Sequence, residues 1–322
     1  MSENWYEHKE TTNLGYKLMF LTLKILPSVF MRFLAFFIGF FYWLFDKRTR
    51  RVSKYYLSKV GKSSSLKHVI SFALNLVENV QSWAGKFSFK NVSWQNDDVN
   101  DLVEKINSAK GCLIVMSHLG NSQMLKGLAS FGESGTERKM SITTITDAEL
   151  TSGFGALIQK INPDSNFHII SSNNIGPDTI FLLQERPEKG EVVVIAGDRI
   201  GAHSDRYIEL DFLGEKARFP YGVFLLTALL NVPTYFMNGL RHKDLTLNPH
   251  YDMFVKKSEI DFDCGRKERE ERIRATAEKY AENLAELAKK HPFQWYNFFD
   301  FWDLKSVNIE RKTICLVDNS LP

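Results

Sequence analysis

Residues 111–123 of this chain read GCLIVMSHLGNSQ, and this stretch decides the fold. Its five consecutive apolar residues, Cys112–Met116, are typical of a short strand that is buried on both faces of a sheet. The segment that follows contains a histidine, a glycine and an Asn-Ser pair, which are residues that end a strand and begin a helix. We therefore predict a strand–loop–helix unit in which His118 lies directly after the carboxyl end of the strand.

The alternation of strands and helices continues beyond this unit. It predicts an α/β fold with a mostly parallel sheet flanked by helices, and sheets of this kind bind ligands at the carboxyl ends of their strands. A charged amphipathic pattern at residues 263–290 predicts a long helix with one solvated face. The other expected strands are 141–146, 167–170 and 191–196, with one more after the turn at 231–233, and the other expected helices are 123–130, 154–161 and 178–184.

The N-terminal part of the chain is expected to be helical and to contact a membrane. Residues 25–45 read ILPSVFMRFLAFFIGFFYWLF, and basic residues follow at 47–59. An aromatic apolar helix beside a basic cluster is typical of a protein that lies on an anionic bilayer. The uncharged part, 33–45, would span only about 20 Å as a helix, short of the roughly 30 Å hydrocarbon core. A single span is disfavoured by Lys24, Pro27 and Arg32, and a buried core helix is the alternative.

These patterns give two regions: an N-terminal helical membrane-associating segment at 1–60, and a single α/β domain at 61–322. Residues 52–90 place apolar side chains at helical spacing, and a further helix is expected to end at 109–111. The run 223–230 is assigned mainly to the core.

Composition excludes several classes of protein. The net charge of +3 is too small to indicate nucleic-acid binding. Three widely separated cysteines predict no disulfide framework and fit a reducing compartment, with Cys112 as a core residue. We find no histidine pair at metal-ligand spacing, no glycine-rich phosphate loop and no serine elbow, so no metal or cofactor is predicted.

His118 is the strongest candidate for chemistry. Its position after a strand corresponds to the ligand-binding rim of an α/β sheet, and the usual imidazole pKa of about 6.5 suits proton abstraction near neutral pH. Backbone N–H groups at the start of the following helix are expected to hold a phosphate or a developing oxyanion. The alternative is a histidine with a purely structural role.

Three ordered blocks carry a resemblance to a known family. They read SHLGN at 117–121, AGDR at 196–199 followed by FLG at 212–214 and FP at 219–220, and QWYNFFDFW at 294–302. Together they resemble the lysophospholipid acyltransferase superfamily, in particular the branch of the lipid A late (lauroyl/myristoyl-type) acyltransferases and related bacterial acyltransferases. The resemblance covers roughly residues 110–302 and implies that 61–322 is an α/β acyltransferase domain.

The resemblance implies an activity, partners and a location. An acyltransferase of this kind moves a fatty-acyl group from an acyl carrier protein or acyl-CoA thioester to a hydroxyl or amine of a lipid acceptor, without a cofactor. It works at the cytoplasmic face of the inner membrane, as a peripheral protein or with a single N-terminal anchor. The alternatives are a non-catalytic lipid- or acyl-carrier-binding protein and an acyl thioester hydrolase.

The resemblance also implies catalytic residues. The family places an acid five positions after the histidine, where this chain has Gln123. The amide oxygen of Gln123 can accept a hydrogen bond from the imidazole but cannot offset its positive charge. A substitute acid is Asp198, expected at the end of the strand 191–196; the alternatives are a local ion pair with Arg199 and a turn residue after the strand. The catalytic candidates are His118, Gln123 and Asp198.

Substrate-binding candidates come from the same blocks. Arg199 and Arg206 are expected to hold an anionic group of the substrate. Phe212 and Gly214 are expected to line an acyl-chain groove, with a core role as the alternative. The last candidate is Asn121, at the start of the helix after the histidine.

Overall fold

The computed structural model describes residues 26–302, except 97, 131, 133–134, 147–166 and 202–205. The helix expected at 154–161 and Lys24 lie outside the described residues.

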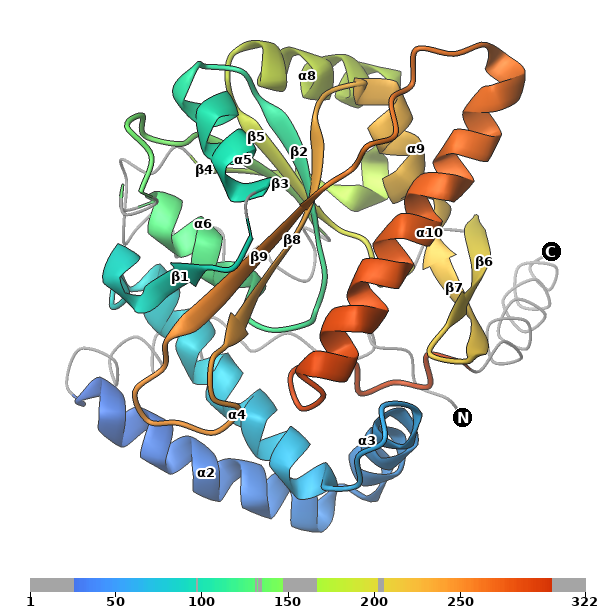
Figure 1. The fold of residues 1–322 in the computed structure, drawn as a ribbon. Helices are drawn as coiled ribbons and strands as arrows, with labels where there is room; N and C mark the ends of the chain where they lie inside the picture. The colour runs from blue at the N-terminus through green and yellow to red at the C-terminus, as the bar shows by residue number, and fades with distance from the viewer. Residues whose placement is uncertain are drawn as a thin grey trace, which may run out of the picture.

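In this described part of the chain, seven strands form one sheet in the order β1-β9-β8-β2-β5-β3-β4 (Figure 1). Neighbouring strands are parallel except for the antiparallel pair β8 and β9. The predicted α/β fold with a mostly parallel sheet is therefore confirmed. The strands are β1 Val92–Trp94, β2 Cys112–Met116, β3 Ile142–Thr146, β4 Phe167–Ser171, β5 Val192–Ala196, β8 Thr234–Arg241 and β9 Tyr251–Lys257.

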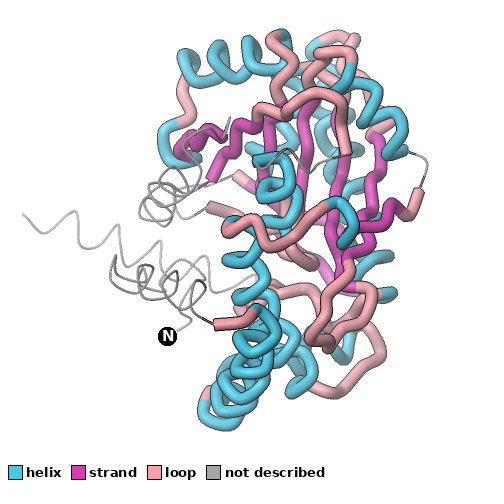
Figure 2. Tube along the Cα trace, turned by 90° about the vertical axis from the view of Figure 1, so that its left-hand side faces the viewer, coloured by secondary structure: helices cyan, strands magenta, loops and turns pink. Residues whose placement is uncertain are grey.

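Strand β2 is apolar throughout because both of its faces are covered. Leu113 and Val115 enter one hydrophobic core, whereas Ile114 and Met116 enter the other together with Cys112, which is fully buried as predicted. Helices lie on both sides of the strands (Figure 2). The first core is covered by α8 Pro177–Glu188, α9 Tyr221–Leu230 and α10 Arg266–Lys290, and the second by α5 Asp98–Asn107 and α6 Ser122–Ser130.

The helical region expected at 52–90 is divided. Helix α3 spans Lys47–Lys59 and α4 spans Ser65–Trp83. Between them Gly61 has a positive φ of 68°, and the hydroxyl of Ser64 accepts from Lys67 N at 3.4 Å at the start of α4. A glycine turn and a serine cap therefore end one helix and start the next.

A β-hairpin was not expected from the sequence. Strands β6 Tyr207–Phe212 and β7 Glu215–Pro220 pair antiparallel, and the two turn residues Leu213 and Gly214 both have positive φ, 52° and 88°. This is the two-residue turn that matches the twist of a hairpin. Exposed and buried side chains alternate along β6, and polar and apolar residues alternate in the same way in the sequence. This alternation is the sequence signal that predicts a strand there.

Helix α2 Ser28–Phe45 lies along α4 (Figure 1). Its buried side contains Gly39, where an added Cβ would come within 3.0 Å of Ile70 Cα, so the small residue permits the close approach. Arg32 also faces the protein, with Nη2 donating to Gln81 Oε1 at 2.7 Å and Nη1 to Leu247 O at 2.7 Å. Arg32, which was expected to disfavour a membrane span, lies on the buried side of the helix and leaves the outer side apolar.

The 18 residues of α2 are long and apolar enough to cross or anchor in a membrane. At 1.5 Å per residue the helix is about 27 Å long, longer than the span expected from 33–45 because it begins at Ser28. The outer side exposes large apolar side chains: Val29, Phe30, Phe33, Leu34, Phe37, Ile38, Phe40, Phe41, Tyr42, Leu44 and Phe45.

Several residues of the basic cluster at 47–59 have partners inside the protein. Arg50 donates to Trp43 O at the end of α2, where helix carbonyls lack intrahelical partners. Arg51 lies 3.4 Å from Asp300, and Lys59 pairs with Glu215 of the hairpin. The cluster therefore also fixes α3 between α2 and the main domain.

Candidate active site

His118 and Asp198 are brought together by strand register. Strands β2 and β5 are parallel neighbours in which Met116 pairs with Ala196, so the residues two positions further on meet at the same rim of the sheet. The imidazole Nδ1–H donates to Asp198 Oδ1 at 2.7 Å, and the backbone N–H of His118 donates to Asp198 Oδ2 at 2.9 Å. The contact expected for a substitute acid is therefore present in the structure.

Asp198 is fully buried and strongly held. A third donor, Trp295 Nε1, lies 3.1 Å from its Oδ2. Burial alone would raise the pKa of Asp198, but the imidazole of His118 and the charge of Arg199 outweigh burial and lower the pKa to about 2. The carboxylate is therefore ionised at neutral pH and fixes the protonated nitrogen of His118 as Nδ1.

His118 is suited to act as a base. Burial and the nearby charge of Arg199 lower its pKa, against the opposing effect of Asp198, so the pKa lies below 6.5 and the ring is neutral at pH 7. Its side chain is 31% exposed and lines a cavity. Because Nδ1 is bonded to Asp198, Nε2 is the ring nitrogen left to take a proton from a ligand.

The loop after His118 is fixed by the closing aromatic block. Tyr296 N donates to His118 O at 3.0 Å, and Gly120 N donates to Gln294 O at 2.8 Å. Gly120 has a φ of 78°, and a Cβ there would lie 2.1 Å from Gly239 O, so this position requires glycine on both counts. The block at 294–302 thus forms part of the site.

The cavity in front of His118 has a volume of about 280 Å³ and is lined by five segments of the chain. Polar groups face it from the His118 loop and from α4, and aromatic groups face it from the closing block and from α2. Its lining residues are Tyr42, Thr49, Phe72, Asn75, Leu76, Asn79, His118, Gly120, Ser122, Gln123, Arg199, Tyr296, Phe298 and Phe299.

Arg199 supplies a positive charge to this cavity. Its Nε donates to Asn297 Oδ1 at 2.9 Å, its Nη2 donates to Tyr296 O at 2.9 Å, and its guanidinium lies 5.7 Å from the ring centre of Phe299. Burial lowers the pKa of Arg199 to about 10, so it is charged at neutral pH. The expected position of Arg199 at the site agrees with the structure.

Gln123 does not orient the histidine. It lines the same cavity, but its Oε1 accepts from Trp83 Nε1 of α4 at 3.2 Å, while the imidazole Nδ1 is bonded to Asp198. In the structure the imidazole is therefore oriented by the carboxylate that follows β5, and not by the side chain five positions after the histidine.

Asn121 is a structural residue, which corrects its expected role in substrate binding. It is fully buried, its Oδ1 accepts from the N–H groups of Gln123 and Met124 at 3.0 and 2.9 Å, and its Nδ2 donates to Tyr251. Since the N–H groups of Gly120 and Asn121 are bonded to Gln294 O and Gly239 O, four amides near the helix start have partners in the protein. The prediction that the helix-start amides hold an oxyanion is wrong for these four.

Three other expected substrate-binding residues lie away from the cavity lining. Arg206 stacks on Tyr221 with 3.8 Å between the guanidinium carbon and the ring centre. Phe212 is a core residue packed against Trp295, and Gly214 occupies the hairpin turn. The sequence block FLG therefore specifies a turn and a core contact.

A buried ionic network behind the cavity could not be read from the sequence. Glu78 of α4 and Arg241 of β8 are almost completely buried, with Arg241 Nε 3.2 Å from Glu78 Oε2. Tyr251 also donates to Glu78, and Arg241 donates to the hydroxyl of Tyr296. The network therefore connects α4, and Tyr296 in the lining of the cavity, to strands of the sheet.

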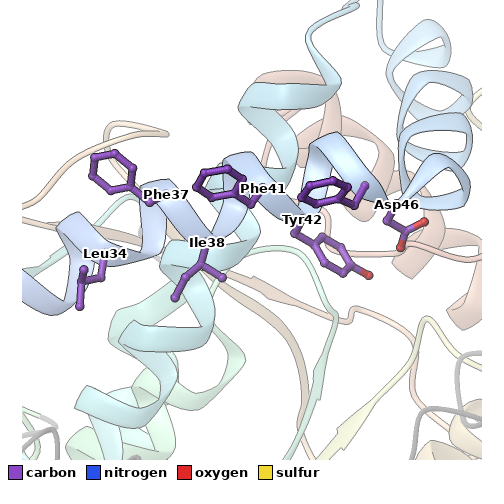
Figure 3. Close-up of a pocket in the computed structure, with 7 residues that line it drawn as sticks. Leu34, Phe37, Ile38, Phe41, Tyr42 and Asp46 are labelled. Atoms are coloured by element: carbon purple, nitrogen blue, oxygen red, sulfur yellow. The ribbon is translucent and has the colours of Figure 1, made fainter.

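The outer side of α2 bears an open apolar groove that shares one lining residue with the His118 cavity. The groove is lined by residues of α2 that follow one another toward its carboxyl end, and by the residue after that end (Figure 3): Leu34, Phe37, Ile38, Phe41, Tyr42, Phe45 and Asp46. Tyr42 lines both the groove and the His118 cavity. The exposed apolar surface and the candidate base thus share a boundary residue.

Comparison with protein-family models and with curated proteins gives no match for this chain. Among the described residues, no group of three or more histidine, cysteine or acidic side chains is arranged to hold a metal ion.

Proposed function

We propose that the protein is an acyltransferase that moves a fatty-acyl group from a thioester, carried by acyl carrier protein or coenzyme A, to a lipid acceptor at a membrane surface. The observation that carries this proposal is the His118–Asp198 pair, 2.7 Å apart, at a cavity that adjoins the apolar side of α2. The resemblance of residues 110–302 to the lysophospholipid acyltransferase superfamily supports the same reaction.

The proposed reaction is a direct transfer. Nε2 of His118 removes the proton of the acceptor hydroxyl, and the acceptor oxygen attacks the thioester carbonyl carbon. Arg199 stabilises the negative charge that develops on the carbonyl oxygen, since it is the cation at the described lining of the cavity. The C–S bond then breaks, and His118 returns the proton to the departing thiolate.

Asp198 has two tasks in this proposal. Its hydrogen bond fixes the tautomer in which Nε2 is unprotonated, and its charge stabilises the imidazolium that forms when His118 takes the proton. An amide at Gln123 could perform the first task but not the second, because it has no charge.

We propose that α2 lies flat in the interface of the cytoplasmic leaflet. One side of the helix packs on α4 and buries Arg32, whereas a spanning helix would have lipid around it. The exposed side chains of the other side are large and aromatic, as in helices that insert into the headgroup–acyl boundary. Lipid chains in the bilayer would then lie beside the groove, which shares Tyr42 with the His118 cavity.

This orientation predicts a loss of membrane binding on charge insertion. The double variant Phe37→Glu/Ile38→Glu should bind vesicles of phosphatidylcholine and phosphatidylglycerol about 100-fold more weakly, because two large apolar side chains leave the bilayer. The fold should be retained, since both side chains are at least half exposed. Vesicle flotation measures the partitioning.

Phe181→Glu is the matched control, because Phe181 is equally exposed but lies on α8, at the opposite end of the molecule from α2 (Figure 1). Equal losses for the two variants, or none for either, would contradict the proposed orientation.

The test of the function is the identity of the product. The purified chain is incubated with membranes and with radiolabelled acyl carrier protein or acyl-CoA, and the labelled species are identified by mass. The proposal requires a labelled lipid. Free fatty acid as the dominant product would indicate a hydrolase, and binding of the donor without turnover would indicate a non-catalytic binding protein.

A further inference from the structure

We propose that Asn75 and Asn79 of α4 form a subsite for the headgroup of the acceptor lipid, and that this headgroup is uncharged and carries several hydroxyls, as in glycerol or a sugar. The role of the bound lipid as an acceptor rests on the proposed function, whereas the binding itself does not.

The two amides lie on the side of α4 that faces His118. Phe72, Asn75, Leu76 and Asn79 all line the cavity, and their spacing of three and four residues places them on one face of the helix. Asn75 and Asn79 are one turn apart, which separates their positions by about 6 Å along the axis. Two neighbouring hydroxyls of a polyol can therefore be contacted together.

Both amides have unused hydrogen-bonding capacity. Asn75 is only 5% exposed, and neither its Oδ1 nor the Oδ1 of Asn79 has a partner among the described residues, although both atoms are shielded from bulk solvent. Buried polar atoms of this kind are rare because leaving them unpaired is costly. Since both residues line a cavity, a bound ligand is the partner that the arrangement fits.

The unpaired amide oxygens and the charge of the cavity together favour hydroxyls over charged groups. The two oxygens need donors, which a phosphate lacks, and the described lining contains the cation Arg199 and no carboxylate, so an ammonium group would meet a like charge. A side-chain amide offers an acceptor and donors together. A hydroxyl can donate a hydrogen bond to the amide oxygen and accept one from the amide N–H. A phosphate only accepts hydrogen bonds, and an ammonium only donates them.

The apolar residues of the same surface orient the lipid. Phe72 and Leu76 lie on the α4 face beside the two amides, and Tyr42 lines both the cavity and the groove on α2. A lipid whose chain follows the groove would place its headgroup between α4 and Nε2 of His118. One hydroxyl would then face the base while its neighbours contact the amides.

The test compares three lipids that share one chain: monopalmitoylglycerol, hexadecylamine and hexadecyl phosphate. Binding to the full-length protein in detergent is measured by calorimetry. The wild type should bind monopalmitoylglycerol most tightly. The double variant Asn75→Leu/Asn79→Leu should bind it ~30-fold more weakly, the effect of losing two hydrogen bonds, with little change for the other two lipids.

Stability separates a binding role from a structural role. The melting temperature of the double variant should be unchanged or higher than that of the wild type, because the two Oδ1 atoms lose no partner in the protein. A lower melting temperature with an equal loss for all three lipids would overturn the proposal, and so would wild-type preference for the amine or the phosphate. Asn248→Leu, at an exposed position between β8 and β9, is the matched control and should bind as the wild type does.

Acyl transfer is assayed separately, so that the two proposals fail independently. If the wild type binds monopalmitoylglycerol in an asparagine-dependent way but transfers no acyl group, the proposed subsite is supported and the proposed acyltransferase activity is rejected. If the wild type and the asparagine variant transfer the acyl group at the same rate, the proposed subsite is rejected and the proposed acyltransferase activity is supported.

Discussion

Asp198→Asn and His118→Ala should each lower kcat for acyl transfer by about 10³- to 10⁴-fold. The first variant keeps the size of the side chain but removes the charge that lies 2.7 Å from Nδ1, so the imidazolium formed in the reaction loses its stabilisation. The second variant removes the base. Initial rates with a saturating thioester donor measure both effects.

The pH profile adds a signature of the base. The active form is the neutral imidazole, and burial together with Arg199 holds the pKa of His118 below 6.5. Plotted against pH, kcat/KM should therefore rise through a midpoint below 6.5 and stay high at pH 7. Because the carboxylate raises the pKa of His118, the midpoint should move further down in Asp198→Asn.

A second histidine–aspartate pair provides the matched control. His242 Nδ1 lies 2.9 Å from Asp252 Oδ2, but the His242 side chain is 63% exposed and lies outside the lining of the active-site cavity. His242→Ala should retain wild-type rates. Full activity of His118→Ala, or an equal loss in His242→Ala, would refute the assignment of His118 as the base, and full activity of Asp198→Asn would refute the role given to the carboxylate.

Arg241→Met should destabilise the protein by at least about 3 kcal/mol. The substitution leaves Glu78 buried without its nearest counter-charge, and burial already raises the pKa of Glu78 against the effects of Arg241, Tyr251 and Arg32. It also removes the donor to Tyr296. The free energy of unfolding from urea titration measures the loss.

The comparison with an exposed ion pair tests the reason for this loss. Lys216 pairs with Asp211 at 2.9 Å, but both side chains are more than half exposed, so Lys216→Met should cost less than about 1 kcal/mol. The combined variant Arg241→Met/Glu78→Leu should recover stability, because it removes the uncompensated charge. Failure of the combined variant to recover would show that lost packing dominates.

Local sequence patterns predicted the parts of the site that depend on single strands. A buried strand followed by a polar residue was sufficient to place His118 and Asp198 at one rim of the sheet. Their direct contact depends on β2 and β5 being neighbours, which no local pattern states. Asn121 was misassigned because a helix-capping side chain and a ligand-binding side chain use the same residue types.

The rest of the site depends on contacts between distant segments. Asn75 and Asn79 look like ordinary polar positions of a helix until α4 is packed against the His118 loop. Glu78 and Arg241 are separated by about half of the chain, and a buried ion pair between them has no local sequence signal. Phe212 and Gly214 were placed in a groove because the alternation of β6 was not recognised as a hairpin strand.

The contacts made by the closing block have a consequence for the synthesis of the protein. Trp295 Nε1 completes the set of donors around Asp198, and Gln294 O and Tyr296 N hold the loop that carries His118. A chain still emerging from the ribosome lacks this brace until almost all of its described length has been made. Products that end before Gln294 would thus carry His118 without the contacts that orient it, and the arrangement of the candidate site would form only after residues 294–296 have been made.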